Sequence, residues 1–300
     1  NPEDGQVWYN STTGNLRVEG IQGTGSWASG GTLGTARYQG GGAGTQTAGL
    51  IFGGNGFTAN TEEYDGTSFS EQNDMATARR AIGGCGLQTA ALAAGGYAGG
   101  PLAGVANTEE YDGTSWGPGG NLNTARLGST AFGIQTVAVA AGGYVSTASV
   151  TNVEEYNGSA WTAVTALPAA RNGLGSAGTQ TAGLTFGGDP GYTNETKEYD
   201  GSSWTAGGNL NTGRGGGAGC GIQTAALFFG GSTPTQVANA EEYNGTSWSN
   251  IASLGTAITN NSSATAGTTS AALSMAGSSP VTAATEEYTV PLETANLSVS

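Results

Sequence analysis

The stretch Glu62-Glu63-Tyr64-Asp65-Gly66-Thr67-Ser68-Phe69 decides the fold, because close copies of it return along the chain. Further copies begin at Glu109, Glu154, Lys197 and Glu241, and a partial copy begins at Glu286. The tyrosines of successive copies lie 47, 45, 43, 44 and 45 residues apart. A period of roughly 40 to 50 residues is typical of arrays whose repeated unit is one small β-sheet.

Within each unit the spacings are nearly constant. From the aromatic residue that ends one copy, an arginine follows after ten residues, a glutamine after nine more and a diglycine after seven more. The arginines are Arg37, Arg79, Arg126, Arg171 and Arg214. Only the distance from diglycine to the next tyrosine varies, from 11 to 16 residues, so length variation is expected in one connection. In the degenerate sixth unit we read Asn260, Thr269 and Ala276-Gly277 as the replacements of the arginine, the glutamine and the diglycine.

Each unit reads as four short strands. Turn signals separate them, and the Asp-Gly or Asn-Gly pair after each tyrosine is a strong hairpin signal because both residues tolerate positive φ. The order diglycine, tyrosine, tryptophan, arginine resembles the kelch repeat of β-propellers, and this resemblance extends from Trp27 to Tyr288. It implies an all-β, six-bladed propeller of four-stranded blades. Periodic tryptophans are then expected in the packing between blades, and periodic arginines in pairs with glutamates or carbonyls.

The two ends of the array predict how the ring closes. Ser26 to Leu33 reads as a fourth strand without the first three, and residues 260 to 288 read as three strands without a fourth. Pairing of the two segments would complete a sixth blade and leave no free edge in the ring.

Cys85 and Cys220 lie three units apart, so we expect two free, packed thiols rather than a disulfide.

A different pattern precedes the ring. Gln6-Val7-Trp8-Tyr9-Asn10, a Ser-Thr-Thr-Gly-Asn turn and Leu16-Arg17-Val18-Glu19 predict an independent hairpin. This phrase resembles short hairpins of bacteriophage tail-fibre and other virion proteins, a resemblance that implies attachment to other virion proteins. The expected domains are a hairpin at 1–22, a propeller at 23–290 and a C-terminal tail at 291–300.

Composition argues against several classes of function. A net charge of -14 with only 8 Lys and Arg residues does not suit a nucleic-acid partner, since phosphate neutralisation needs a basic face. No apolar run reaches the roughly 20 residues of a membrane span, so no membrane insertion is expected. The chain has no histidine, which removes Ser-His-Asp and Cys-His catalysis and most zinc sites. We therefore expect no catalytic, cofactor-binding or metal-binding residues.

The candidate binding residues lie where loop length varies. In an up-and-down blade, the loop between the second and third strands and the loop between blades share one face, and loops on a rigid frame usually carry binding specificity. We expect every length change on that face, in segments 55–61, 97–108, 144–153, 189–196, 232–240 and 278–285 and in the longer passage from Trp248 to Asn260. The aromatic and amide residues there that fall outside the periodic pattern are the predicted ligand contacts, namely Phe57, Tyr97, Asn107, Tyr144, Tyr192 and Asn194.

Two functions are consistent with these observations. The first is a non-enzymatic structural or adhesive virion protein, a phage fibre or decoration protein whose loops bind a host-surface glycan or protein. The second is a secreted bacterial carbohydrate-binding propeller. Both place the chain on a virion or outside the cell, and neighbouring genes would distinguish them.

Overall fold

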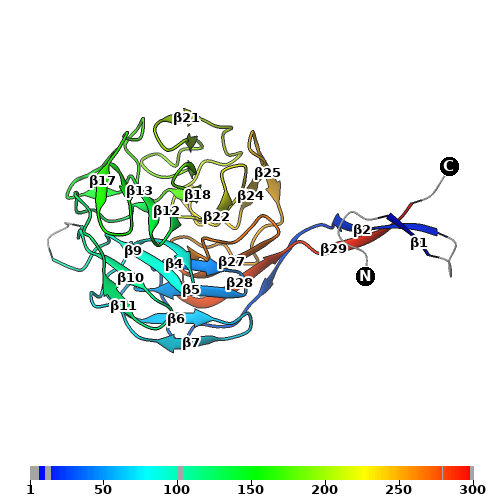
Figure 1. Ribbon diagram of the computed structural model, residues 1–300, viewed down its shortest axis with the longest axis horizontal. Coiled ribbons are helices and arrows are strands. Elements are labelled where there is room, and N and C mark those ends of the chain that lie inside the picture. Colours follow the sequence, from blue (N-terminus) through cyan, green and yellow to red (C-terminus); the bar gives the residue numbers. More distant parts are fainter. Residues whose placement is uncertain (1–6, 11–14, 101–103, 279, 298–300) are drawn as a thin grey trace.

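The computed structural model describes residues 7–10, 15–100, 104–278 and 280–297, and its regular elements in these ranges are all β-strands. Six four-stranded antiparallel sheets are arranged as blades around a central axis (Figure 1). The structure therefore confirms the six-bladed propeller. The strands of the blades are rich in Gly, Ala and Thr. They are short because a turn or loop follows each of them after a few residues.

Blades 1 to 5 follow one another along the chain, with strand order from the axis outward equal to sequence order. Blade 1 contains β4 (Gly41–Thr45), β5 (Ala48–Phe52), β6 (Thr61–Tyr64) and β7 (Phe69–Gln72). Blade 2 contains β8 (Gly83–Leu87), β9 (Ala90–Ala94), β10 (Thr108–Tyr111) and β11 (Trp116–Pro118). Blade 3 contains β12 (Thr130–Ile134), β13 (Val137–Ala141), β16 (Val153–Tyr156) and β17 (Trp161–Ala163), with the small hairpin β14 (Tyr144–Val145) and β15 (Ala148–Ser149) in its loop.

Blade 4 contains β18 (Gly175–Thr179), β19 (Ala182–Phe186), β20 (Thr196–Tyr199) and β21 (Trp204–Ala206). Blade 5 contains β22 (Ala218–Ile222), β23 (Ala225–Phe229), β24 (Ala240–Tyr243) and β25 (Trp248–Ile251). Blade 6 is built from both ends of the chain: β26 (Ser262–Ser263), β27 (Ala271–Gly277) and β28 (Thr282–Thr289) are completed by β3 (Ser26–Ser29) as the outer strand. In that pair Tyr288 lies opposite Trp27.

The chain direction gives the ring two different rims. Turns between first and second strands, such as Gln46-Thr47, and between third and fourth strands, such as Asp65-Gly66, form what we call the turn rim. Connections between second and third strands, and between successive blades, form the loop rim on the opposite side.

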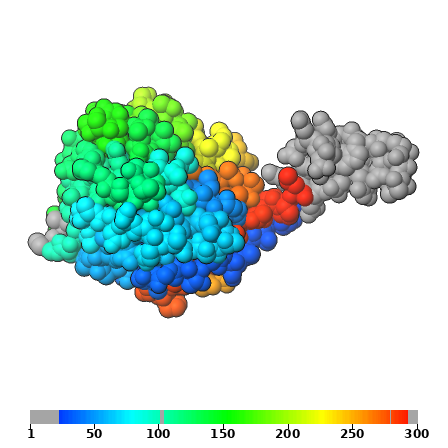
Figure 2. Space-filling model, turned by 60° about the horizontal axis from the view of Figure 1, so that its bottom comes forward, coloured from blue at the N-terminus to red at the C-terminus, as the bar shows by residue number. Residues whose placement is uncertain are grey.

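A separate three-stranded sheet leaves the ring at the turn rim. In blade 6, no turn joins β28 to β3. Instead, β28 leads outward to β29 (Leu292–Leu297), and β2 (Asn15–Gln22) leads inward to β3. Strand β2 pairs with β29 on one side and with β1 (Val7–Asn10) on the other. Figure 2 shows the two connecting segments, blue and red, leaving the ring together at one edge. We call β1, β2 and β29 the stalk sheet; the turn expected at residues 11–14 lies outside the described residues. Strand β29 lies within residues 291–300, where the sequence pattern predicts a tail and gives no signal for a strand.

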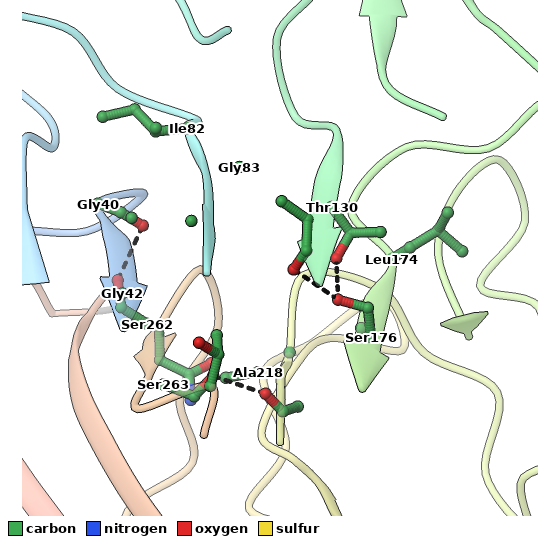
Figure 3. Close-up of a pocket in the computed structure, with 18 of the residues that line it drawn as sticks. Gly40, Gly42, Ile82, Gly83, Thr130, Leu174, Ser176, Ala218, Ser262 and Ser263 are labelled. Atoms are coloured by element: carbon green, nitrogen blue, oxygen red, sulfur yellow. Dashed lines mark hydrogen bonds between the residues drawn. The ribbon is translucent and has the colours of Figure 1, made fainter. Parts of the chain in front are cut away.

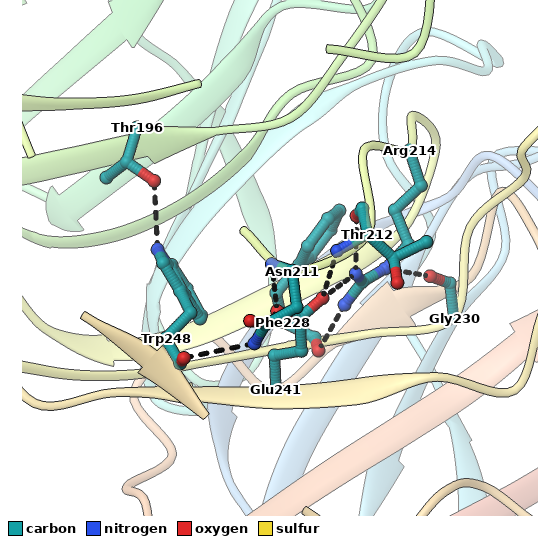
Figure 4. Close-up of polar contacts among 8 residues, drawn as sticks. All are labelled: Thr196, Asn211, Thr212, Arg214, Phe228, Gly230, Glu241 and Trp248. Atoms are coloured by element: carbon teal, nitrogen blue, oxygen red, sulfur yellow. Dashed lines mark hydrogen bonds and ion pairs between the residues drawn. The ribbon is translucent and has the colours of Figure 1, made fainter. Parts of the chain in front are cut away.

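Four blades contain a fully buried arginine paired with the first glutamate of the repeat. The pairs are Arg37–Glu62, Arg79–Glu109, Arg126–Glu154 and Arg214–Glu241. In blade 5, Arg214 also donates to the carbonyl oxygens of Thr212, Phe228 and Gly230 at 2.9 to 3.0 Å (Figure 4). Desolvation lowers the pKa of Arg214, while the Glu241 carboxylate opposes that shift. The expected pairing of periodic arginines with glutamates is confirmed in these blades.

Blade 4 departs from this pattern. Lys197 stands where the other blades have the first glutamate, so Arg171 pairs with Glu195 instead, at 3.5 Å. The Arg171 and Glu195 side chains are 20% and 41% exposed. The ion pair has moved from the core toward the surface.

In blade 6 the sequence prediction for Asn260 was wrong. Ile258 occupies the arginine position, since its backbone N–H donates to Val237 as that of Arg126 donates to Val105. The interval from Trp248 to Ile258 is ten residues, as in the other units. The two extra residues of this unit lie after β26, between Ser263 and the bridge that pairs Thr268 with Ala271. The prediction that all length changes lie on the loop rim therefore also fails in this blade.

Asn260 belongs to a closed ring of main-chain hydrogen bonds at the loop-rim end of the axis. One residue per blade donates its N–H to the carbonyl oxygen of the equivalent residue in the preceding blade, at 2.6 to 3.1 Å. All six have φ between 53° and 67°, and they are Gln39, Ala81, Gly128, Gly173, Gly216 and Asn260. This geometry explains why glycine is used at three of these positions.

Neighbouring blades are joined by repeated side-chain contacts. The Tyr111 hydroxyl donates to Glu63 of the preceding blade, and the Gln88 side chain donates to the Tyr64 carbonyl. Trp116 packs edge-on against Phe52 and donates to Thr61. The expected packing of tryptophans between blades is thus confirmed.

Cys85 and Cys220 are free and fully buried as expected, and burial raises the pKa of each thiol to about 12.

Candidate functional site

The central channel is one candidate site, because all six inner strands converge on it. Its cavity has a volume of about 110 Å³ and is lined mainly by Gly, Ser, Thr and Ala residues (Figure 3). The strands approach so closely that a methyl group on Gly42 would lie 2.2 Å from the Ser263 carbonyl oxygen. This close approach accounts for part of the high glycine content.

Polar groups in the channel are hydroxyls and amides. Ser262 and Ser263 donate to the carbonyl oxygens of Gly40 and Gly219 at 2.9 and 2.7 Å. The side-chain oxygens of Ser129 and Asn261 are buried there without a partner among the described residues. The described residues that line the channel include no titratable group, so it offers hydrogen bonds to water but no general acid or base.

The predicted ligand residues lie on the loop rim, in different blades. Tyr97 and Tyr144 occupy equivalent places in blades 2 and 3, because each pairs with the residue that follows the repeat arginine. Tyr192 lies in the loop between β19 and β20 and has a φ of 48°. Asn107 and Asn194 are exposed just before β10 and β20.

Two of the six predicted residues, Phe57 and Tyr97, form a ring-to-ring contact. The rings of Phe57 and Tyr97 meet edge-on with centroids 5.4 Å apart, and Phe57 is 39% exposed. The guanidinium carbon of Arg80 lies 5.5 Å from the Phe57 centroid and 5.4 Å from that of Tyr97. We call Phe57, Arg80 and Tyr97 the loop-rim cluster.

Arg80 was missed by sequence reasoning. It follows Arg79 directly and lies outside the periodic pattern of arginines. Because adjacent residues of an extended segment point in opposite directions, a second arginine beside a buried one is expected at the surface. That signal could have identified it.

The loop-rim cluster combines three chemical properties. Two aromatic rings offer apolar surface, the guanidinium offers N–H donors and positive charge, and the Tyr97 hydroxyl is fixed by a 2.6 Å hydrogen bond to the Gly100 carbonyl oxygen. Tyr144 and Tyr192 make no ring-to-ring contact with the cluster among the residues that the structure describes.

The turn rim carries the aspartates of the repeat. Asp65 accepts hydrogen bonds from the backbone of Ser68 and from the side chain and backbone of Thr67, which lower its pKa to about 2. Asp112 has equivalent contacts and a pKa of about 2, and the pKa of Asp200 is lowered as well. In blades 3 and 5 an asparagine makes the same turn, as Asn157 does with Ser159 and Ala160.

We therefore expect the triple variant Asp65→Asn, Asp112→Asn and Asp200→Asn to lose less stability in acid than the natural protein. A carboxylate whose pKa is lowered on folding stabilises the fold above its unfolded value near 3.8 and loses that contribution as pH falls toward 2. Thermal melts between pH 5 and pH 2 would measure the difference. Other carboxylates are present in both proteins, so parallel melting curves would contradict the prediction.

The described residues contain no group of three or more His, Cys, Asp or Glu side chains suited to hold a metal ion. None of their elements is a helix long and apolar enough to cross a bilayer.

Comparison with known proteins does not assign the chain to a family. No protein-family model matches it, and no curated protein matches it. The fold and the geometry of the two rims therefore carry the functional argument.

Proposed function

We propose that the protein is a non-enzymatic adhesive module that is held by its stalk sheet and binds a host-surface glycan or protein with its loop rim. The observation that carries this proposal is the placement of the stalk sheet. In the other five blades a turn joins the third strand to the fourth. In blade 6 the stalk sheet leaves the ring at the equivalent position, on the rim opposite the loops. A module attached in this way presents its variable loops outward.

The finer proposal is a virion component. Residues 1–22, together with β29, would attach the ring to other virion proteins, and the chain would act at a virion surface as a phage fibre or decoration protein. Support comes from the opposed rims and from the resemblance of the segment around Val7 to Val18 to virion hairpins. Weak binding at one ring would be sufficient, since many copies on one particle raise the effective concentration.

The proposed ligand class follows from the loop-rim cluster. Aromatic faces stack on the apolar faces of sugars, and Arg80 can pair with a carboxylate or hydrogen-bond to hydroxyls. An acidic glycan fits this combination best, because Arg80 places positive charge at the surface of a protein that is otherwise strongly acidic. Tyr144, Tyr192, Asn107 and Asn194 would extend contacts to neighbouring blades.

A triple variant tests the proposal. Phe57→Gly, Arg80→Ala and Tyr97→Ser remove the cluster, and glycine at 57 suits the φ of 54° found there. We expect at least about a tenfold loss of apparent affinity on an acidic-glycan array and on host cells, equal to about 1.4 kcal/mol. A second variant with Tyr144→Ala and Tyr192→Ala tests the rest of the predicted site.

A matched control changes the opposite rim. Ile134→Ser and Ile222→Ser alter exposed residues beside turn-rim turns, where the side chains are 53% and 56% exposed. This control should bind as well as the natural protein. Unchanged binding by both loop-rim variants would refute the proposed location of the site.

A secreted bacterial carbohydrate-binding propeller is the second candidate. The loop-rim cluster favours it equally, since stacking on a sugar does not depend on a particle. Genes for capsid and tail proteins beside this gene would support the virion function, and genes for polysaccharide use would support the alternative.

A further inference from the structure

Blade 6 differs from the other blades at the site of the buried ion pair. Ile258 replaces the arginine, but the glutamate is retained as Glu286 on β28. A cavity of about 90 Å³ lies at this place. We call it the Glu286 pocket.

The acceptors that surround Arg214 in blade 5 have counterparts around this pocket. Arg214 contacts the Glu241 carboxylate and the carbonyl oxygens of three residues, Thr212, Phe228 and Gly230. The repeat places Glu286, Thr256, Ser274 and Ala276 at the equivalent positions, and all four line the pocket. A set of acceptors suited to a guanidinium is thus retained at a place that no arginine of the described side chains occupies.

The Glu286 carboxylate is held as it is in the paired blades. Its Oε2 accepts from the Gly255 N–H at 2.6 Å and its Oε1 from the Thr256 N–H at 3.2 Å. Glu241 accepts the equivalent N–H groups at 2.7 and 3.3 Å, and its Oε1 also accepts from Arg214. Glu286 has no ion-pair partner among the described residues. Its carboxylate is therefore positioned for a cation that the blade lacks.

In blade 4 the glutamate is replaced by Lys197 but the arginine is retained, and the cavity there is smaller than the Glu286 pocket. Arg171 still fills the equivalent place there, and the cavity is only about 20 Å³. Replacement of the arginine in blade 6 is what leaves a larger space. Gly255, Thr256 and Ala257 are exposed, so the pocket is open to solvent at its border, and Ile258 and Ala276 provide apolar contact for an alkyl chain.

We propose that the Glu286 pocket binds an alkylguanidinium group supplied from outside the chain, as the side chain of an arginine in a partner protein or as a small guanidinium compound. Two or more charge-assisted hydrogen bonds to the carboxylate and the carbonyl oxygens would hold the planar group. This site is separate from the loop-rim cluster and does not depend on glycan binding.

Titration with ethylguanidinium chloride tests the proposal. The full chain is observed through the amide resonances of Gly255 and Thr256, at ionic strength held constant with NaCl. We expect saturable shifts with a dissociation constant in the millimolar range. Tetramethylammonium, a cation without N–H donors, should cause no such shifts. Absence of a saturable response to ethylguanidinium would overturn the proposal.

Two variants complete the test. Glu286→Gln should weaken binding at least tenfold. Ile258→Arg should abolish it, because the chain's own arginine would then fill the pocket as in blade 5, and this variant remains informative if Glu286→Gln fails to fold. Binding to Ile258→Arg as tight as to the natural protein would overturn the proposal.

A comparison of two ligands identifies the source of the guanidinium group. Tighter binding of a Gly-Arg-Gly peptide than of ethylguanidinium would identify a protein arginine as the source. Tighter binding of ethylguanidinium would identify a small compound.

Discussion

Deletion of residues 1–30 should open the ring and remove most of its stability. The deletion removes β3, so that β28 becomes an unpaired edge, and it removes Trp27, whose ring lies 4.9 Å from Phe229 and 5.2 Å from Tyr288. Loss of a fully buried tryptophan costs about 3–5 kcal/mol, and loss of the half-buried Trp27 costs part of that, while a typical domain is stabilised by roughly 5–15 kcal/mol. Differential scanning calorimetry and size-exclusion chromatography should show an unfolded or multimeric protein.

The matched control deletes residues 1–22 only. It removes β1 and β2 but keeps the pairing of Ser26–Ser29 with β28 and the hydrogen bond from Trp27 to the Ala252 carbonyl oxygen. This protein should keep the oligomeric state of the full chain and melt within a few degrees of it. Equal melting temperatures for the two deletions would show that β3 does not close the ring.

Arg214→Met should destabilise the protein by about 3–5 kcal/mol. The change leaves the Glu241 carboxylate buried without its cation and removes donors from the carbonyl oxygens of Phe228 and Gly230. Glu241→Gln should also be strongly destabilising, for the converse reason. The double variant should recover part of the loss, because neither charge is then buried alone. Urea titration gives each free energy of unfolding.

The same chain provides the control for this prediction. Arg171 and Glu195 form the equivalent pair of blade 4 in a more exposed position. Because exposed ion pairs contribute about 0–1 kcal/mol, Arg171→Met should cost much less than Arg214→Met. Similar losses for both would mean that burial of the pair is not what makes Arg214 important.

Periodicity made most of the ring predictable. The fixed interval from Phe69 to Arg79 and Gln88 reflects contacts that recur in five units, so the number of blades and the strand order follow from it. It failed in blade 6, which has two extra residues after its inner strand, because the spacing of residues along the chain cannot distinguish an insertion before Ser263 from one after it. Strand β29 was missed because its polar sequence has no periodic signal and its partner β2 is distant in the chain.

The candidate sites were less predictable than the fold. Phe57 and Tyr97 could be chosen because they break the repeat, but their contact with each other and with Arg80 depends on how two loops of different blades meet. The Glu286 pocket depends on recognising Ile258 as the arginine's replacement, which required the hydrogen bonds of the backbone.

Orientation-controlled binding tests the central claim most directly. The natural cysteines are buried, so a single cysteine added before residue 1, or in place of Ser146 in the β14–β15 turn, can be coupled selectively to a sensor surface. The account predicts binding of the acidic glycan or host-surface extract when the protein is held through the stalk sheet, and loss of that binding when it is held through the loop rim. Equal binding in both orientations would contradict it.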